Sequence, residues 1–165
     1  PSNPQATFKF SFDVKTSAYE GIIFYCANKN HKEFISIFMK DHLLVFSYNL
    51  GSGVVVMRST QPVNDDEWHS VIAQRQNEMG VLYIDGLQES NGSNSKFDHY
   101  KHIDLRPPYY VGGLPQIVTE MSHSNTEDIN LSLSGCIKDM QLNDLKLDGE
   151  HKYINVQKCS EKVEP

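Results

Sequence analysis

The sequence predicts an all-β domain, either a sandwich or a barrel, and two features of the chain indicate it. Apolar and polar residues alternate over many short stretches, which is the period of a strand that buries one face. Turn-forming residues recur about every eight to twelve positions, a spacing typical of all-β folds. A third observation argues against a helical fold, because the apolar spacing of three and four residues is never sustained over about ten positions.

The clearest strand pattern lies near the beginning of the chain. From Thr7 to Lys15 every second residue is apolar, so one face of this strand is predicted to lie in the core, with the side chains of Phe8, Phe10, Phe12 and Val14. Later apolar runs predict further strands at Ile22–Ala27, Phe34–Met39, Leu43–Tyr48, Val54–Arg58, Trp68–Arg75, Val81–Ile84, Tyr109–Gly113, Ile137–Leu142 and Leu145–Leu147.

Polar and glycine-containing segments separate these strands. Asp85-Gly86 and Asn143-Asp144 are predicted to be tight turns, and Asn77–Gly80 is predicted to be a hairpin turn. The stretch Gln88–Arg106 is rich in Ser, Asn, Asp and His and is predicted to be a long surface loop. A second polar loop is predicted at Gln116–Asp128. Long surface loops often hold binding residues.

Length and charge limit the classes of protein to which the chain can belong. Its 165 residues fit one domain, residues 1–165, and a domain near this length buries about 70% of the surface of its unfolded chain. The net charge of −6, with scattered Lys and Arg, argues against nucleic-acid binding, which needs a basic face. Strong binding to sulfated glycans is disfavoured unless a local basic patch exists. No apolar run approaches the roughly 20 residues of a membrane span, so no membrane insertion is expected.

Three cysteines are present, so at most one bridge forms within the chain and one thiol is left over. Cys26 lies in a strand-like apolar run and is predicted to be a buried free thiol. A bridge between Cys136 and Cys159 would close a loop of about 24 residues and stabilise the fold by roughly 3 kcal/mol in the chain-entropy model.

Catalysis is not expected from the motifs. The close histidine pair His99 and His102 lies in a predicted loop, with no His-Glu-x-x-His helix or Cys-x-x-Cys partner. No serine occupies a Gly-x-Ser-x-Gly elbow, and no glycine-rich loop precedes a helix.

Six motifs occur in order along the chain. They are Glu20-Gly21-Ile22-Ile23-Phe24-Tyr25, Phe46-Ser47-Tyr48-Asn49-Leu50-Gly51-Ser52-Gly53, Asn64-Asp65-Asp66-Glu67-Trp68-His69-Ser70-Val71, Leu82-Tyr83-Ile84-Asp85-Gly86, Tyr110-Val111-Gly112-Gly113-Leu114-Pro115 and Gly135-Cys136-Ile137-Lys138-Asp139-Met140-Gln141-Leu142-Asn143. Together they resemble the pattern of laminin G-like domains, and the resemblance extends from about Phe8 to Cys159. Within this family the chain is most similar to laminin α chain modules, with agrin and perlecan modules as close competitors.

The resemblance implies a jelly-roll sandwich of two antiparallel sheets, the concanavalin-like architecture, with a core spanning about residues 7–159. It implies a disulfide between Cys136 and Cys159 and a ligand-binding rim of loops at one edge. We interpret Trp68, Tyr83 and Tyr110 as core residues, because buried aromatic side chains remove large apolar areas from water.

The same resemblance implies a secreted, extracellular adhesion module of the basement membrane. Its expected partners are cell-surface receptors such as dystroglycan or integrins, with sulfated glycans as a further class. Two alternatives stay open at this point. One is a carbohydrate-binding module, because legume lectins and pentraxins share this architecture, and the other is a structural spacer without a ligand. Fold alone does not decide between them.

Calcium is the one cofactor that the resemblance raises. Calcium needs several oxygen ligands, usually including a carboxylate. Calcium-binding relatives place one acidic residue after the strand equivalent to the one ending at Tyr48, but residues 42–64 contain no Asp or Glu. Asn49 is left to offer a neutral oxygen there, with Asn125, Glu127 or Asp128 as the second ligand. We therefore expect weaker calcium binding at this rim than in those relatives.

Two N-glycosylation sequons are present, Asn91-Gly92-Ser93 and Asn130-Leu131-Ser132. Asn91 lies in the long predicted loop, where a sugar is easily accommodated. Asn130 lies closer to the strand that contains Cys136. Both asparagines are candidate glycosylation sites.

Overall fold

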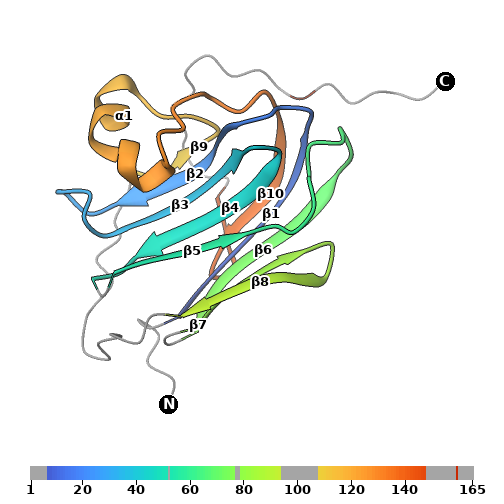
Figure 1. The fold of residues 1–165 in the computed structure, drawn as a ribbon, viewed down its shortest axis with the longest axis horizontal. Helices are drawn as coiled ribbons and strands as arrows, with labels where there is room; N and C mark the ends of the chain where they lie inside the picture. The colour runs from blue at the N-terminus through green and yellow to red at the C-terminus, as the bar shows by residue number, and fades with distance from the viewer. Residues whose placement is uncertain (1–6, 52, 77–78, 94–107, 148–158, 160–165) are drawn as a thin grey trace.

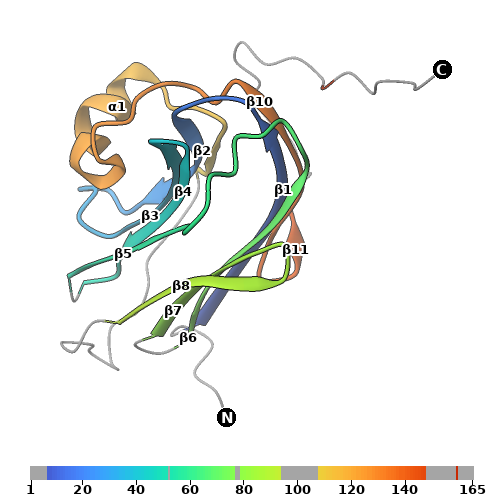
Figure 2. The ribbon, with the colours of Figure 1, turned by 45° about the vertical axis from the view of Figure 1, so that its right-hand side comes forward.

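The computed structural model describes residues 7–51, 53–76, 79–93, 108–147 and 159. Two antiparallel sheets lie face to face, and a short helical segment lies against the outer side of one of them (Figure 1, Figure 2). The prediction of an all-β antiparallel jelly-roll sandwich is confirmed.

The larger sheet has the strand order β11-β10-β1-β6-β7-β8 within the described ranges. Its strands are β1 (Thr7–Thr16), β6 (His69–Gln76), β7 (Met79–Ile84), β8 (Leu87–Ser93), β10 (Gly135–Leu142) and β11 (Leu145–Lys146). The smaller sheet has the order β5-β4-β3-β2-β9. Its strands are β2 (Gly21–Ala27), β3 (Phe34–Lys40), β4 (Leu43–Asn49), β5 (Val54–Arg58) and β9 (Tyr110–Val111).

Strand β1 occupies the centre of the larger sheet, between β6 and β10. The alternation predicted for this strand is confirmed, because its four inward apolar side chains are buried. They meet those of the smaller sheet through aromatic contacts. The Phe10 and Phe24 rings lie 4.2 Å apart between centroids, and Phe8 lies 5.8 Å from both Phe46 and Tyr48. These contacts join the two sheets into one core.

The outer side of the smaller sheet is covered by helical segments α1 (Gln116–Ser122) and η1 (His123–Thr126) (Figure 2). Val118 packs on Tyr25 and Phe34, and a separate cluster at Ile129 buries Ile22, Phe38 and Val45. This cover explains why β2, β3 and β4 are buried on both faces and are almost continuously apolar.

The prediction of a loop at Gln116–Asp128 was wrong over residues 116–126. The seven residues of α1 are too few for a helical apolar period to emerge from a sequence window. A single buried apolar side chain, Val118, together with packing on the sheet, determines its position. Tertiary contact, not propensity, accounts for this helix.

Two further boundaries differ from the sequence prediction. Residues Leu87–Ser93 form edge strand β8, although Gln88–Arg106 was predicted to be a loop; residues 94–106 lie outside the described residues. No side chain of β8 is buried, so its sequence lacks the alternation of apolar and polar residues that marks a half-buried strand. The predicted turn at Asn77–Gly80 is shorter, because Met79 and Gly80 already belong to β7; residues 77 and 78 are outside the described part.

Trp68 was predicted to be a core residue, and this was wrong. Its side chain is 40% exposed, and the ammonium of Lys138 lies 4.1 Å from the ring centroid. The inward positions of the adjacent strand are Val71 and Ala73, so the period of two directs Trp68 outward. Tyr83 and Tyr110 are only partly buried.

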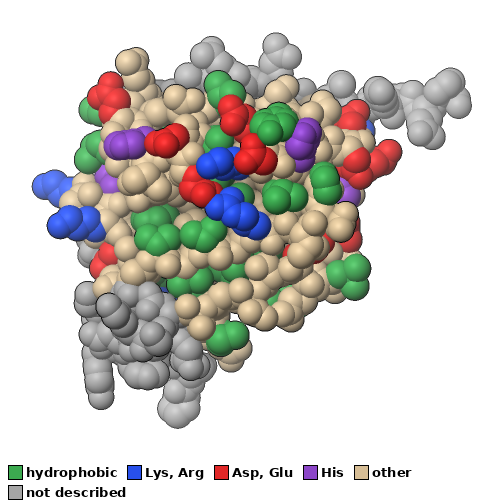
Figure 3. Space-filling view, viewed as in Figure 1, with side chains coloured by type: hydrophobic (Ala, Val, Ile, Leu, Met, Phe, Trp, Pro, Cys, Tyr) green, Lys and Arg blue, Asp and Glu red, His purple; other side chains and the backbone are tan. Residues whose placement is uncertain are grey.

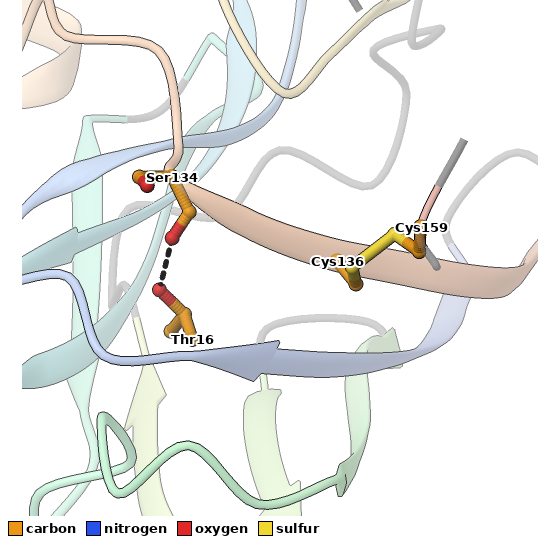
Figure 4. The surroundings of a disulfide bond; sticks show 4 residues. All are labelled: Thr16, Ser134, Cys136 and Cys159. Atoms are coloured by element: carbon orange, nitrogen blue, oxygen red, sulfur yellow. Dashed lines mark hydrogen bonds between the residues drawn. A yellow bond between two sulfur atoms is a disulfide. The ribbon is translucent and has the colours of Figure 1, made fainter. Parts of the chain in front are cut away.

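The cysteines divide into one bridge and one thiol. Cys136 and Cys159 form a disulfide with their Cα atoms 5.8 Å apart, and beside it the Thr16 hydroxyl donates to the Ser134 carbonyl at 2.7 Å (Figure 4). Cys26 is a free, buried thiol, as predicted, and burial raises its pKa to about 12. A thiol held in this protonated form is a poor nucleophile.

Because Phe10 joins the two sheets, truncating it should leave a cavity that the packed core cannot close. We expect Phe10→Ala to lower the free energy of unfolding by about 3–5 kcal/mol in urea denaturation. The matched control is Leu87→Ala, at a side chain that is 71% exposed, and it should change stability by less than about 0.5 kcal/mol. Equal effects of the two substitutions would contradict this account of the core.

Candidate functional site

One end of the smaller sheet brings two loops together. Ala27 pairs with Phe34, Phe34 pairs with Asn49, and Asn49 pairs with Val54. The β2–β3 loop (28–33) and the β4–β5 loop (50–53) therefore leave the sheet at the same end. We call these two loops, with η1 beside them, the rim.

The segment η1 is tied to the rim by Asn125. Its side-chain amide donates to the His31 carbonyl at 2.8 Å and to the Tyr25 hydroxyl at 3.1 Å. The Tyr25 hydroxyl and His31 Nδ1 lie 2.7 Å apart. With His31 in the tautomer that leaves Nδ1 unprotonated, the Tyr25 hydroxyl donates to it. The backbone carbonyl of Asn125 also accepts from the Ser36 hydroxyl at 2.7 Å. Asn125 therefore anchors η1 to both the sheet and the loop.

Burial shifts the pKa values of Tyr25 and His31 so that the neutral form of each side chain is favoured. Burial raises the pKa of Tyr25 to about 12, which keeps its hydroxyl protonated as a donor. Burial lowers the pKa of His31, which keeps its ring neutral and able to accept. The contact is therefore neutral and stable around pH 7. Sequence reasoning identified Asn125 but missed Tyr25 and His31, because no local motif joins residues so far apart.

Asn49 shapes the other loop of the rim. Its Oδ1 accepts from the backbone N–H groups of Gly51 at 2.9 Å and Gly53 at 3.2 Å. Both glycines have positive φ angles, 101° and 115°, which residues with a side chain rarely adopt. The side chain of Asn49 therefore holds the loop that it begins.

Charged side chains form a small cluster on the outer side of the same sheet. Glu127 contacts the Arg58 guanidinium through Oε1, and Lys40 Nζ lies 3.9 Å from the same oxygen. Figure 3 shows Lys, Arg and acidic side chains side by side in the middle of this face. The cluster joins the end of η1 to β3 and β5. Asp128 is exposed beside it, with a φ of 66°.

These positions do not fit a calcium ion. The side-chain oxygen of Asn49 is engaged within its loop, Asn125 directs its amide toward Tyr25 and His31, and Glu127 is paired with cations. Only Asp128 offers an exposed carboxylate among the residues that the sequence suggested. In the described part of the chain, no group of three or more His, Cys, Asp and Glu side chains gathers as a metal site.

A second cluster lies where β6 begins. His69 Nε2 is 2.7 Å from an Asp65 carboxylate oxygen, and His69 Nδ1 is 2.7 Å from Asp85. Asp85 also accepts from the Ser70 backbone N–H at 2.9 Å. Both ring nitrogens of His69 can donate at once only when the ring is protonated. The cluster thus ties the loop before β6 to the tight turn predicted at Asp85-Gly86, where both residues have positive φ angles.

Opposing effects act on the pKa of His69. Burial disfavours its charged form, but the hydrogen bonds that His69 donates to Asp85 and Asp65 outweigh burial and raise the pKa above its usual value. The hydrogen bond to His69 lowers the pKa of Asp65. At Asp85, burial raises the pKa, and the bonds to His69 and Ser70 reverse that effect, so its pKa is lowered. The arrangement is an ion-pair clasp, and it contains no nucleophile for a triad.

Both sequon asparagines are exposed, on different parts of the sandwich. Asn91 lies in edge strand β8, opposite Val81, and not in a loop as predicted. Asn130 lies between η1 and β10, next to Leu131, whose carbonyl accepts from the Ile22 N–H at 2.8 Å.

The fold defines a β-sandwich module of two antiparallel sheets. A family model for the laminin G domain matches residues 14–148. The chain is 31% identical over 149 residues to the mouse basement membrane-specific heparan sulfate proteoglycan core protein, covering 86% of the chain and 4% of that protein. It is 29% identical over 160 residues to mouse laminin subunit alpha-4, covering 93% of the chain and 8% of the relative. The chain belongs to the laminin G domain family.

Solved structures agree on the fold. Domains LG4-5 of the mouse laminin alpha1 chain superpose with a TM-score of 0.75 at 22% identity, covering 89% of this chain and 38% of theirs. The chain spans less than a tenth of the two relatives above, so the activities of those whole proteins do not transfer to it directly. The relatives are matrix proteins, and they indicate no enzyme family. Among the described residues, no helix is long and apolar enough to cross a bilayer.

The raised pKa of His69 predicts a pH-dependent contribution to stability. It is fully present below the unfolded-state value near 6.5 and is lost as pH rises through the higher folded-state pKa. The melting-temperature difference between the wild type and His69→Gln should therefore be largest near pH 6 and shrink toward pH 9. The control His123→Gln, at an exposed histidine on η1, should follow the wild type. A melting-temperature difference that does not change with pH would contradict a stabilising ion pair between protonated His69 and the two aspartates.

Proposed function

We propose that this chain is a secreted adhesion module of the basement membrane that binds a cell-surface receptor or a matrix partner through the rim. Membership of the laminin G domain family is the observation that carries the proposal. The matching relatives are extracellular matrix proteins, which supports a binding module and a location outside the cell. Dystroglycan and integrin ectodomains are the partners to test first.

The geometry of the rim supports its role as the recognition surface. The Asn125 contacts hold the β2–β3 loop against η1, and Asn49 holds the β4–β5 loop. Loops held in this way lose less conformational entropy on binding. Lys29, Asn30 and Lys32 are exposed at the tip of the β2–β3 loop and belong to no core cluster. They are free to contact a partner.

The double substitution Lys29→Glu and Lys32→Glu should weaken binding to a receptor ectodomain at least tenfold in surface plasmon resonance, because it reverses the charge of the rim loop. The charge-matched control is the double substitution Lys9→Glu and Lys146→Glu, at exposed positions on strands β1 and β11 of the other sheet, and it should bind as the wild type. Binding should persist in EDTA, because the rim residues do not fit calcium. Equal losses in both variants would overturn the rim as the site, and loss in EDTA would restore a metal to it.

We also propose that Asn91 and Asn130 are glycosylated in the secreted protein, since both are exposed sequon asparagines. Protein secreted from eukaryotic cells should lose mass on glycosidase treatment in intact-mass spectrometry. Asn91→Gln and Asn130→Gln should each remove one glycan, and the double variant should be insensitive to the enzyme. An unchanged mass in the wild type would refute the proposal.

A further inference from the structure

Strand β5 forms one border of the smaller sheet. Its side chains alternate between the core and the outer face, with Val55 and Met57 buried. Val54 and Val56 are 56% and 41% exposed on the outer face. In the described residues β5 is hydrogen-bonded to β4 on one side and to no strand on the other, while β8 of the larger sheet lies against its inner face, with Gly92 next to Val55. An exposed, apolar edge strand is a template for pairing with another chain.

The register with β4 shows which backbone groups of β5 face that open side. The Ser59 N–H donates to the Leu44 carbonyl at 2.8 Å. Hydrogen-bonded pairs alternate along an antiparallel ladder, so the bonded pairs continue at Phe46–Met57 and Tyr48–Val55. The N–H and C=O groups of the intervening residues therefore point away from β4, and these residues are Val54, Val56 and Arg58.

We propose that β5 pairs antiparallel with β5 of a second copy of this chain, about a two-fold axis at Val56. In this register Val56 faces its own equivalent, and Val54 faces Arg58 of the other copy. The outward N–H and C=O groups of all three residues then meet the outward C=O and N–H groups of the other copy. Each such pair of residues exchanges two N–H···O bonds. The contact is isologous and closes with two chains.

The side chains of β5 favour pairing with β5 of a second copy. Arg58 is the one charged residue of β5, and the register places it opposite a valine, so no like charges meet. Its own Glu127 already contacts its guanidinium, and its aliphatic stem is left to pack on Val54 of the other copy. Paired β-branched side chains stabilise antiparallel strands.

The other borders of the described sheets suit pairing less well. Strands β9 and β11 have two residues each. Strand β8 includes Glu89, Gly92 and the sequon asparagine Asn91, features that discourage strand addition. Of these borders, only β5 combines five residues with an apolar outer face and no glycine, proline or acid.

Pairing through β5 would join two five-stranded sheets into one continuous sheet. Because the strands run antiparallel, the two rims would lie at opposite ends of the dimer and remain free for partners. This inference goes beyond the proposed function, since a monomer is sufficient for rim binding. A contact of five residues per chain is small, so the dimer should be weak and visible only at high concentration.

Sedimentation velocity over about 1 μM to 1 mM protein tests the proposal. The mass of the wild type should rise from 18.8 kDa toward twice that value. Val56→Lys places two like charges at the two-fold axis and should keep the chain monomeric. The control Val111→Lys, at an exposed valine on β9, should associate as the wild type. A monomeric wild type, or association in Val56→Lys, would overturn the proposal.

A second variant tests the register itself. Antiparallel bonded residues have Cα atoms about 5.5 Å apart, within the range of a disulfide. Val56→Cys should therefore oxidise to a covalent dimer at high concentration, and Val111→Cys should remain monomeric. Melting temperatures near that of the wild type establish that the variants fold. Receptor binding by monomeric Val56→Lys separates the two ideas, because rim recognition survives even when edge pairing fails.

Discussion

Packing between the two sheets is the constraint on which the rest of the structure depends. Every strand of the interior contributes alternate side chains to one apolar layer, and the aromatic contacts of Phe8 and Phe10 with Phe46 and Phe24 join the halves. A shift of one residue in an alternating strand such as β1 would move its apolar side chains to the wrong face. Strand register, and with it the position of each loop, follows from this layer.

The rim is a consequence of that register. Because neighbouring strands end level at Ala27, Phe34 and Asn49, their loops emerge together. The segment η1 lies beside the sheet, and its Asn125 donates a hydrogen bond to the β2–β3 loop at the His31 carbonyl. Local hydrogen bonds thus engage the side-chain oxygen of Asn49 and the amide nitrogen of Asn125. The result is a rim whose two loops are held in place by hydrogen bonds within the chain.

Edges and outer faces differ in how they are protected. Helical segments cover most of the outer face of the smaller sheet, yet β5 extends beyond them with two exposed valines. Strands β2 to β4 are apolar on both faces because the helical segments and Ile129 pack on their outer face. The described helical segments do not pack on β5, so its outer side chains are exposed. The same sheet therefore has a covered centre and a border with exposed apolar side chains.

The strands of the core were predictable from the sequence because the period of two is local. Phe8, Phe10, Phe12 and Val14 were identified as inward-facing residues, and Cys26 as a buried thiol, from their neighbours alone. The order of six motifs also identified the family. Trp68 was misassigned because its size was given more weight than its phase in the strand.

Tertiary structure decided everything that depends on residues distant in the sequence. The helix at Gln116–Ser122 and the edge strand Leu87–Ser93 form because the sheets offer them surfaces, and their own sequences are too short or too polar to specify them. The contacts of Asn125 with Tyr25, and of His69 with Asp85, join residues far apart in the chain. A sequence determines local period and composition, whereas the meeting of such side chains exists only after the sheets have packed.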